Sequence, residues 1–107
     1  MNIDQLWDAI RRREQYLQEI PPPQRGEFHR DLIATYGPYM ANDIYQFRTD
    51  GVVNCSWVSL FGTAATAAQR KALERGLRTL EQAGRIAWAG RSKYRVMCDQ
   101  VLSPNES

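Results

Sequence analysis

The sequence predicts a mainly α-helical α+β fold that ends in a small β-hairpin. Its 107 residues suffice for one domain with its own core, since domains typically contain roughly 50 to 250 residues. Its composition, 43% hydrophobic and 24% charged, is close to the average of globular proteins and argues against disorder. Apolar residues recur at helical spacing over most of the chain, and two short strand-like segments surround a glycine-containing turn near the C-terminus.

The N-terminal half is expected to form three helices, at residues 4–19, about 24–36 and 38–47. A helix-breaking sequence follows each of them: Pro21-Pro22-Pro23, Gly37-Pro38 and the turn Thr49-Asp50-Gly51. Asn2 or Asp4 is the expected N-cap of the first helix. We interpret residues 1–49 as an N-terminal helical extension that packs on the core of the protein.

Residues 50–97 are interpreted as that core. Val52-Val53 is a candidate for a very short strand. Asn54 or Ser56 is expected to cap a short helix, which Gly62 ends in a left-handed conformation. A connector of small residues then leads into the next helix.

The strongest predicted element is a helix from about residue 66 to 83, which consists of good helix formers and is ended by Gly84. Its leucines fall on one side, which we expect to be buried: Leu73, Leu77 and Leu80. The opposite side is basic and polar: Lys71, Arg75, Arg78 and Gln82. Strands at 85–88 and 93–97, around a turn at 89–92, are expected to form the hairpin, and residues 98–107 a flexible tail.

The charge is distributed unevenly along the chain, although the net charge is only +2. Residues 1–62 contain six basic and eight acidic residues, whereas residues 63–97 contain eight basic residues and only Glu74 and Glu81 as acidic ones. The positive field is therefore concentrated on one third of the sequence. Such an asymmetry is typical of a surface that meets phosphates or anionic lipid.

Several function classes are not expected. The sequence has no secretory signal and no apolar run long enough to span a bilayer, so we expect a cytoplasmic protein without membrane contact. It contains none of the common nucleotide-binding, zinc-protease or serine-hydrolase motifs, so we expect neither catalysis nor a cofactor. His29 is the only histidine, and Cys55 and Cys98 lack metal-ligand spacing, so we expect no metal site and two reduced thiols.

Most aromatic residues are expected in the core because of their spacing: Trp7, Trp57, Trp88, Tyr39, Tyr45 and Phe47. The alternative is a stacking surface for single-stranded bases, and Tyr94 on the hairpin fits it best. For the run Arg11-Arg12-Arg13, a solvated face with acidic neighbours is favoured over phosphate contact.

The order of a short helix, a connector, a long basic helix and a basic hairpin resembles the winged helix-turn-helix family of DNA-binding domains. The sequence from Gly76 to Ile86, with Leu80-Glu81 before Gly84, is similar to the end of the recognition helix and the first wing strand in many of its members. The resemblance covers about residues 50–97. The connector from Gly62 to Ala68 is longer than the three or four residues that are usual in this motif.

The resemblance implies that the helix at about 66–83 enters the major groove of DNA and that the hairpin at 85–97 acts as the wing. A helix that is apolar on one side and basic on the other agrees with this implication. The candidate DNA-binding residues are Thr66, Arg70, Lys71, Glu74, Arg75, Arg78, Arg91, Ser92 and Lys93. In the alternative, this side of the helix is only solvated surface, with Glu74 paired to Arg70 or Arg78.

The expected function is sequence-specific or general binding of double-stranded DNA, as a small transcriptional regulator or a mobile-element accessory protein. The alternative is a protein–protein interaction module, an adaptor or inhibitor, on the same fold. Many members of the family bind paired half-sites, so the apolar stripe of the first helix (Leu6, Trp7, Ile10 and Leu17) is a candidate surface for a homodimer. A monomer that buries this stripe in itself is equally compatible with the sequence.

Overall fold

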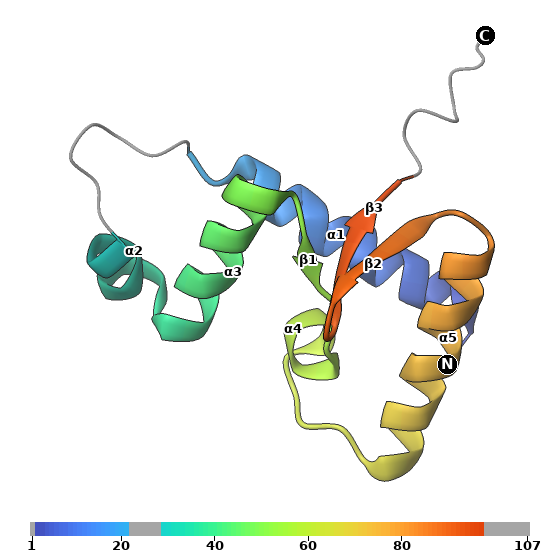
Figure 1. Cartoon of the computed structure of the whole chain (residues 1–107). Helices are drawn as coiled ribbons and strands as arrows, with labels where there is room; N and C mark the ends of the chain where they lie inside the picture. The colour runs from blue at the N-terminus through green and yellow to red at the C-terminus, as the bar shows by residue number, and fades with distance from the viewer. Residues whose placement is uncertain (1, 22–28, 98–107) are drawn as a thin grey trace, which may run out of the picture.

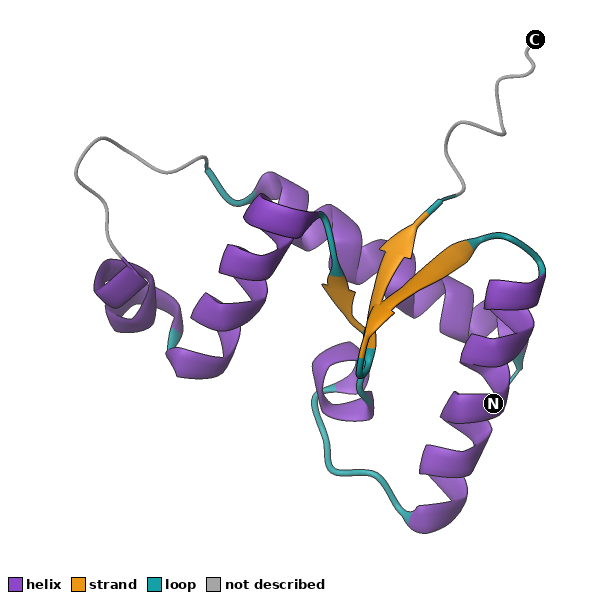
Figure 2. Ribbon diagram, viewed as in Figure 1, coloured by secondary structure: helices purple, strands orange, loops and turns teal. Residues whose placement is uncertain are grey.

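A computed structural model of the chain describes residues 2–21 and 29–97 (Figure 1). The elements, in chain order, are α1 (Ile3–Glu19), α2 (His29–Tyr36), α3 (Pro38–Asp50), β1 (Val53–Asn54), α4 (Trp57–Phe61), α5 (Ala67–Gln82), β2 (Ile86–Gly90) and β3 (Lys93–Val96). Helices dominate, and the strands form one three-stranded antiparallel sheet (Figure 2). The predicted α+β class with a mainly helical chain is therefore confirmed.

Helices α1 and α4 begin close to the predicted residues because side chains cap their first turns. Asn2, rather than Asp4, caps α1, and its side chain accepts a hydrogen bond from the backbone N–H of Gln5 at 2.8 Å. Ser56, rather than Asn54, caps α4 in the same way. These local signals depend on residues only three positions apart, and the sequence alone contains them.

Two predicted boundaries were wrong. Helix α3 continues through Thr49 and Asp50, which we expected in a turn, because Gly51 adopts φ 70 and ends the helix one residue later. Strand β1 is shifted by one residue and starts at Val53. Within the described residues, the second helix starts at His29, and the expected residues 24–28 lie outside them. No helix in the described ranges is both long enough and apolar enough to cross a lipid bilayer.

The sheet joins the middle of the chain to its C-terminal part. Its order is β1-β3-β2, with Val53 opposite Tyr94 and Trp88 opposite Tyr94 on the other side. Beyond β1, the backbone N–H of Cys55 donates to the carbonyl of Ser92 at 2.7 Å. The hairpin turn is therefore fixed against the segment that leads into α4.

The hairpin turn is tighter than predicted. We expected a turn at 89–92, but β2 extends to Gly90, and only Arg91 and Ser92 connect the strands. A register shift between Trp88 and Gly90 marks a bulge, which lets the strand continue past the expected end. Ser92, the second residue of this turn, adopts the left-handed conformation with φ 60.

The core lies between α1, α5 and the sheet. Leu6 and Ile10 of α1 are completely buried, and α1 packs against α5, whose leucine stripe is buried as predicted. The two helices approach closely at Gly76, where a Cβ atom would lie 2.5 Å from Cδ2 of Leu6. Figure 1 shows α1 crossing behind the sheet. The N-terminal helix is thus part of the core cluster to which residues 50–97 also contribute.

This packing agrees with the second of the two expectations for the first helix, a chain that buries the apolar stripe in itself. Leu6, Ile10 and Leu17 are buried within the chain, and Trp7 is half-buried between Arg11 and Arg85, whose guanidinium carbons lie 5.7 and 5.2 Å from its ring. Three of the four residues of the stripe are therefore covered within one chain, and Trp7 is partly covered.

Three aromatic residues expected in the core are exposed instead. Tyr39 at the start of α3 is 90% exposed, Tyr45 is 52% exposed, and Trp88 on β2 is 62% exposed. Helices α2 and α3 pack on each other, and Figure 1 shows them on the side of the sheet remote from α5. The spacing of apolar residues predicts which side of a helix faces the core. It does not predict how much of that side the rest of the protein covers.

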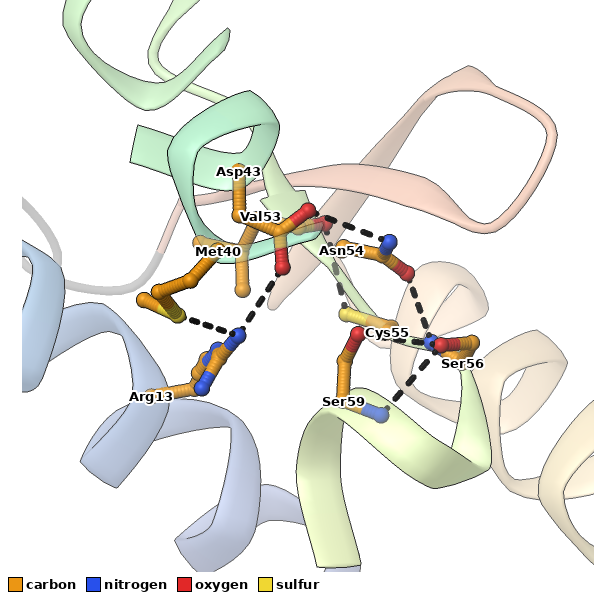
Figure 3. Close-up of polar contacts among 8 residues, drawn as sticks. All are labelled: Arg13, Met40, Asp43, Val53, Asn54, Cys55, Ser56 and Ser59. Atoms are coloured by element: carbon orange, nitrogen blue, oxygen red, sulfur yellow. Dashed lines mark hydrogen bonds and ion pairs between the residues drawn. The ribbon is translucent and has the colours of Figure 1, made fainter. Parts of the chain in front are cut away.

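A polar cluster connects α1, α3, β1 and the start of α4 (Figure 3). Nη2 of Arg13 donates to Oδ2 of Asp43 at 2.8 Å, and Nδ2 of Asn54 donates to Oδ1 of the same carboxylate at 3.3 Å. Oδ1 of Asn54 accepts from the backbone N–H of Ser56 at 3.0 Å. The expectation of a solvated face is therefore wrong for Arg13, although it holds for Arg12, which pairs with Asp8 in an exposed position.

Candidate nucleic-acid interface

Helix α5 carries most of the predicted site. A capping box closes its first turn: the Thr66 hydroxyl accepts from the backbone N–H of Gln69, and the Gln69 side chain accepts from the backbone N–H of Thr66. Gly84, with φ 77, ends the helix, so that the backbone N–H of Arg85 reaches the carbonyl of Leu80 at 3.0 Å. Because its leucines are held in the core, the rest of the helix surface is presented outward.

The basic side chains of this helix are available to a partner. Four of them are exposed: Arg70, Lys71, Arg75 and Arg78. Within residues 2–21 and 29–97, none of these four forms an ion pair, and neither do Arg91 and Lys93 of the hairpin. Among the described residues, Glu74 forms no ion pair with Arg70 or Arg78. On α1, by contrast, all three arginines contact carboxylates: Arg11, Arg12 and Arg13.

A groove of about 710 Å³ lies between α4, α5 and the hairpin. Five of the nine predicted site residues line it: Arg70, Glu74, Arg78, Arg91 and Ser92. Its apolar part consists of Leu73, Leu77, Val58, Trp57, Trp88 and Tyr94. Residues from two distant segments of the chain therefore share one concave surface, with cations around an apolar wall.

The other four predicted residues lie outside this groove. Lys71 and Arg75 are exposed on the side of α5 that turns away from it, since successive helix residues are about 100° apart. Lys93 is half-buried at the start of β3. Thr66 caps α5, and its hydroxyl is engaged within the protein. The predicted site thus consists of an outer basic face on α5 and a groove beside it.

No protein-family model, no curated protein and no solved structure matches the chain. The geometry and charge of α5 and the hairpin therefore carry the functional argument.

Sequence reasoning missed Trp88 as a site residue. Trp88 stands two positions after Ile86, which is buried in the core, and it is paired with Tyr94 across the hairpin. Side chains two apart on a strand share a face, so Trp88 continues the buried face beyond the point where the core ends. The only signal in the sequence that Trp88 would lie beyond the core was its position just before the hairpin turn.

Two titratable groups border the groove. Burial raises the pKa of the Tyr94 hydroxyl, the negative charge of Glu81 and the Cys55 thiol raise it further, and Arg78 acts in the opposite direction. Burial also raises the pKa of Cys55 to about 12, so this side chain is a protonated thiol at neutral pH. The described residues contain no group of three His, Cys, Asp or Glu side chains that could hold a metal ion. The groove offers hydrogen-bond donors, cations and apolar surface.

The state of Cys55 makes a testable prediction. In a Cys98→Ala background, we expect native Cys55 to resist iodoacetamide at pH 8, because it is completely buried and almost entirely protonated. Its ordinary pKa is 9.0, so between pH 9.0 and about 12 the unfolded thiol ionises while the folded one keeps its proton. The free energy of unfolding should therefore fall as the pH rises through this range, by up to about 1.4 kcal/mol per pH unit.

Urea unfolding at pH 9 and pH 10.5 measures this contribution. The Cys55→Ala variant should lose less stability between the two pH values than the protein that retains Cys55. Alkylation of the folded protein at the rate of the unfolded one, or an identical loss in both proteins, would contradict the prediction.

Proposed function

We propose that this chain binds double-stranded DNA through α5 and the β2–β3 hairpin, as a winged-helix domain. The observation that supports it best is the contrast in charge pairing: the cations of α5 and the hairpin are unpaired among the described residues, whereas those of α1 contact carboxylates. Phosphate groups are the partners that such cations favour, and their contacts position a protein on the duplex.

The dimensions of α5 agree with insertion into the major groove. Its 16 residues give a length of about 24 Å, and a helix with side chains is about 10–12 Å across, which matches the roughly 12 Å width of that groove. In this arrangement Lys71 and Arg75 face the DNA, whereas Arg70 lies at the groove and donates Nη1 to the carbonyl of Ala65 at 3.0 Å. Arg91 in the hairpin turn then lies beside the helix, where it contacts the backbone.

The element order supports the same proposal. Helix α4, the connector and α5 correspond to the two helices of the resembled motif, and β2–β3 corresponds to its wing. The connector of residues 62–66 is structured at both ends, by Gly62 with φ 78 and by the Thr66 cap, so its extra length does not disturb the start of α5. A cytoplasmic transcriptional regulator or mobile-element accessory protein is the role we propose for such a domain.

The first test is the salt dependence of binding to a fluorescent random-sequence duplex, followed by anisotropy. Four phosphate contacts predict that the dissociation constant rises about 150-fold between 50 and 200 mM salt. The matched control is Arg12→Gln, which removes an exposed cation of α1 and should leave this dependence unchanged. Absence of binding at 50 mM salt would contradict the proposal.

The alternative function, a protein–protein interaction module, is supported by a different observation. Tyr39 is 90% exposed and borders a second groove of about 720 Å³ between α3 and α4. An exposed aromatic side chain beside a groove is typical of an anchor for a protein partner. Failure of the DNA experiment would favour this alternative.

A further inference from the structure

We propose that the groove between α4, α5 and the hairpin receives an unpaired base, with Trp88 as its stacking surface, so that the chain prefers duplex DNA that continues into a single strand. This inference rests on the proposed function and specifies its substrate. It concerns a surface that the outer face of α5 does not use.

The hairpin presents its aromatic residues toward a concave surface. Trp88 is 62% exposed and lines the groove together with Tyr94, its partner across the hairpin. Leu73 and Leu77 of α5 line the same groove. A flat ring with an open face beside apolar side chains is a surface on which a flat base can stack.

Cations surround this aromatic wall. Arg70 and Arg78 border the groove from α5, and Arg91 borders it from the hairpin turn. None of the three is held by a carboxylate among the described residues. Aromatic rings for bases and cations for phosphates, placed together in one groove, are the combination that binds single-stranded nucleic acid.

The two carboxylates of the groove favour a base over an acidic peptide. Glu74 and Glu81 also line it, and an acidic side chain placed there would meet their negative charge. A nucleobase has exocyclic amino groups, and glutamate accepts hydrogen bonds from such groups. The phosphate then lies toward the arginines and the base edge toward the glutamates.

An intact duplex cannot use this groove. Paired bases are stacked inside the helix, so a base reaches Trp88 only if it is unpaired. The duplex is contacted instead by Lys71 and Arg75 on the outer face of α5. The two surfaces share one helix, so a junction between double-stranded and single-stranded DNA fits both at once.

The experiment compares four fluorescent probes with the full chain at one salt concentration: a blunt duplex, the same duplex with a six-nucleotide single-stranded extension, the single strand alone, and a hexaglutamate peptide. We expect the extended duplex to bind about tenfold more tightly than the blunt one, which is the effect of one stacked base. Trp88→Ala should remove this preference and leave the affinity for the blunt duplex unchanged, and Trp88→Phe should retain part of it.

The matched control is Tyr39→Ala, which removes an exposed aromatic ring on α3 and should keep the preference. Circular dichroism checks that each variant folds. Equal binding of blunt and extended duplexes by the unmodified chain, or a preference that survives Trp88→Ala, would overturn the inference and leave the proposed function standing. Binding of the single strand that depends on Trp88, without binding of the blunt duplex, would support the inference and overturn the proposed function.

Two further outcomes would decide between the proposals. Binding of hexaglutamate that depends on Trp88, without preference for the extended duplex, would overturn the inference and assign the groove to an acidic protein. Absence of binding to all four probes would overturn both proposals.

Discussion

Reversing the charge of Lys71 and Arg75 together is expected to weaken duplex binding by about 100-fold or more at 100 mM salt. Both side chains are exposed on α5 and form no ion pair among the described residues. Each glutamate removes a phosphate contact and places a negative charge where the phosphate lay. The slope of log affinity against log salt should decrease by about 0.9 for each contact that is lost.

The control for this variant is Arg12→Glu with Arg30→Glu, which changes the net charge by the same amount on α1 and α2. Its affinity should stay within about threefold of that of the unmodified chain, since a change at a distance acts only through screened charge. Neither variant removes a buried side chain, so thermal unfolding should remain close to that of the unmodified chain. An unchanged affinity and salt slope after reversal of Lys71 and Arg75 would refute the assignment of the outer basic face.

Removing the carboxylate of Asp43 is expected to destabilise the fold by about 3–5 kcal/mol. The Arg13–Asp43 pair has an N–O distance of 2.8 Å, and the two side chains are only 19% and 7% exposed. Asp43→Ala leaves the guanidinium of Arg13 in this position without its charge partner, and it also leaves Nδ2 of Asn54 without its acceptor. The midpoint of urea unfolding measures the loss.

The exposed pair Arg12–Asp8 provides the control for this prediction. Its side chains are 71% and 69% exposed, so Asp8→Ala should cost at most about 1 kcal/mol. A double variant, Arg13→Met with Asp43→Leu, should recover much of the stability, because it removes both buried charges and keeps apolar volume. Equal losses of unfolding free energy for Asp43→Ala and Asp8→Ala would show that the buried pair stabilises the fold no more than the exposed pair does.

The sequence predicted those parts of the fold that neighbouring residues determine. The caps at Asn2 and Ser56, each one of two expected candidates, act over three residues, and the buried leucine stripe of α5 follows from helical geometry alone. The hairpin was predicted in place, but its turn was not, because a bulge near Trp88 changes the register without a distinct residue pattern.

The groove could not be predicted, because it joins residues that only the tertiary fold brings together. Arg91 is 21 positions after Arg70, and the two line one groove because of the tertiary fold. The backbone hydrogen bond from Cys55 to Ser92 holds the hairpin turn beside the start of α4. Likewise, Asp43 is 30 positions from Arg13, and nothing local distinguishes Arg13 from Arg12. The exposure of Trp88 depends on where the core ends. The alternation of side chains along a strand does not predict that point.

The packing of α1 against α5 has a consequence for synthesis of the chain on the ribosome. Leu6 belongs to the same buried cluster as Leu77, which is translated 71 residues later. At about 5–20 residues per second, the apolar side of the first helix waits about 4–14 s for its partner. During that interval the apolar side of the first helix lacks the side chains of α5 that cover it in the folded protein.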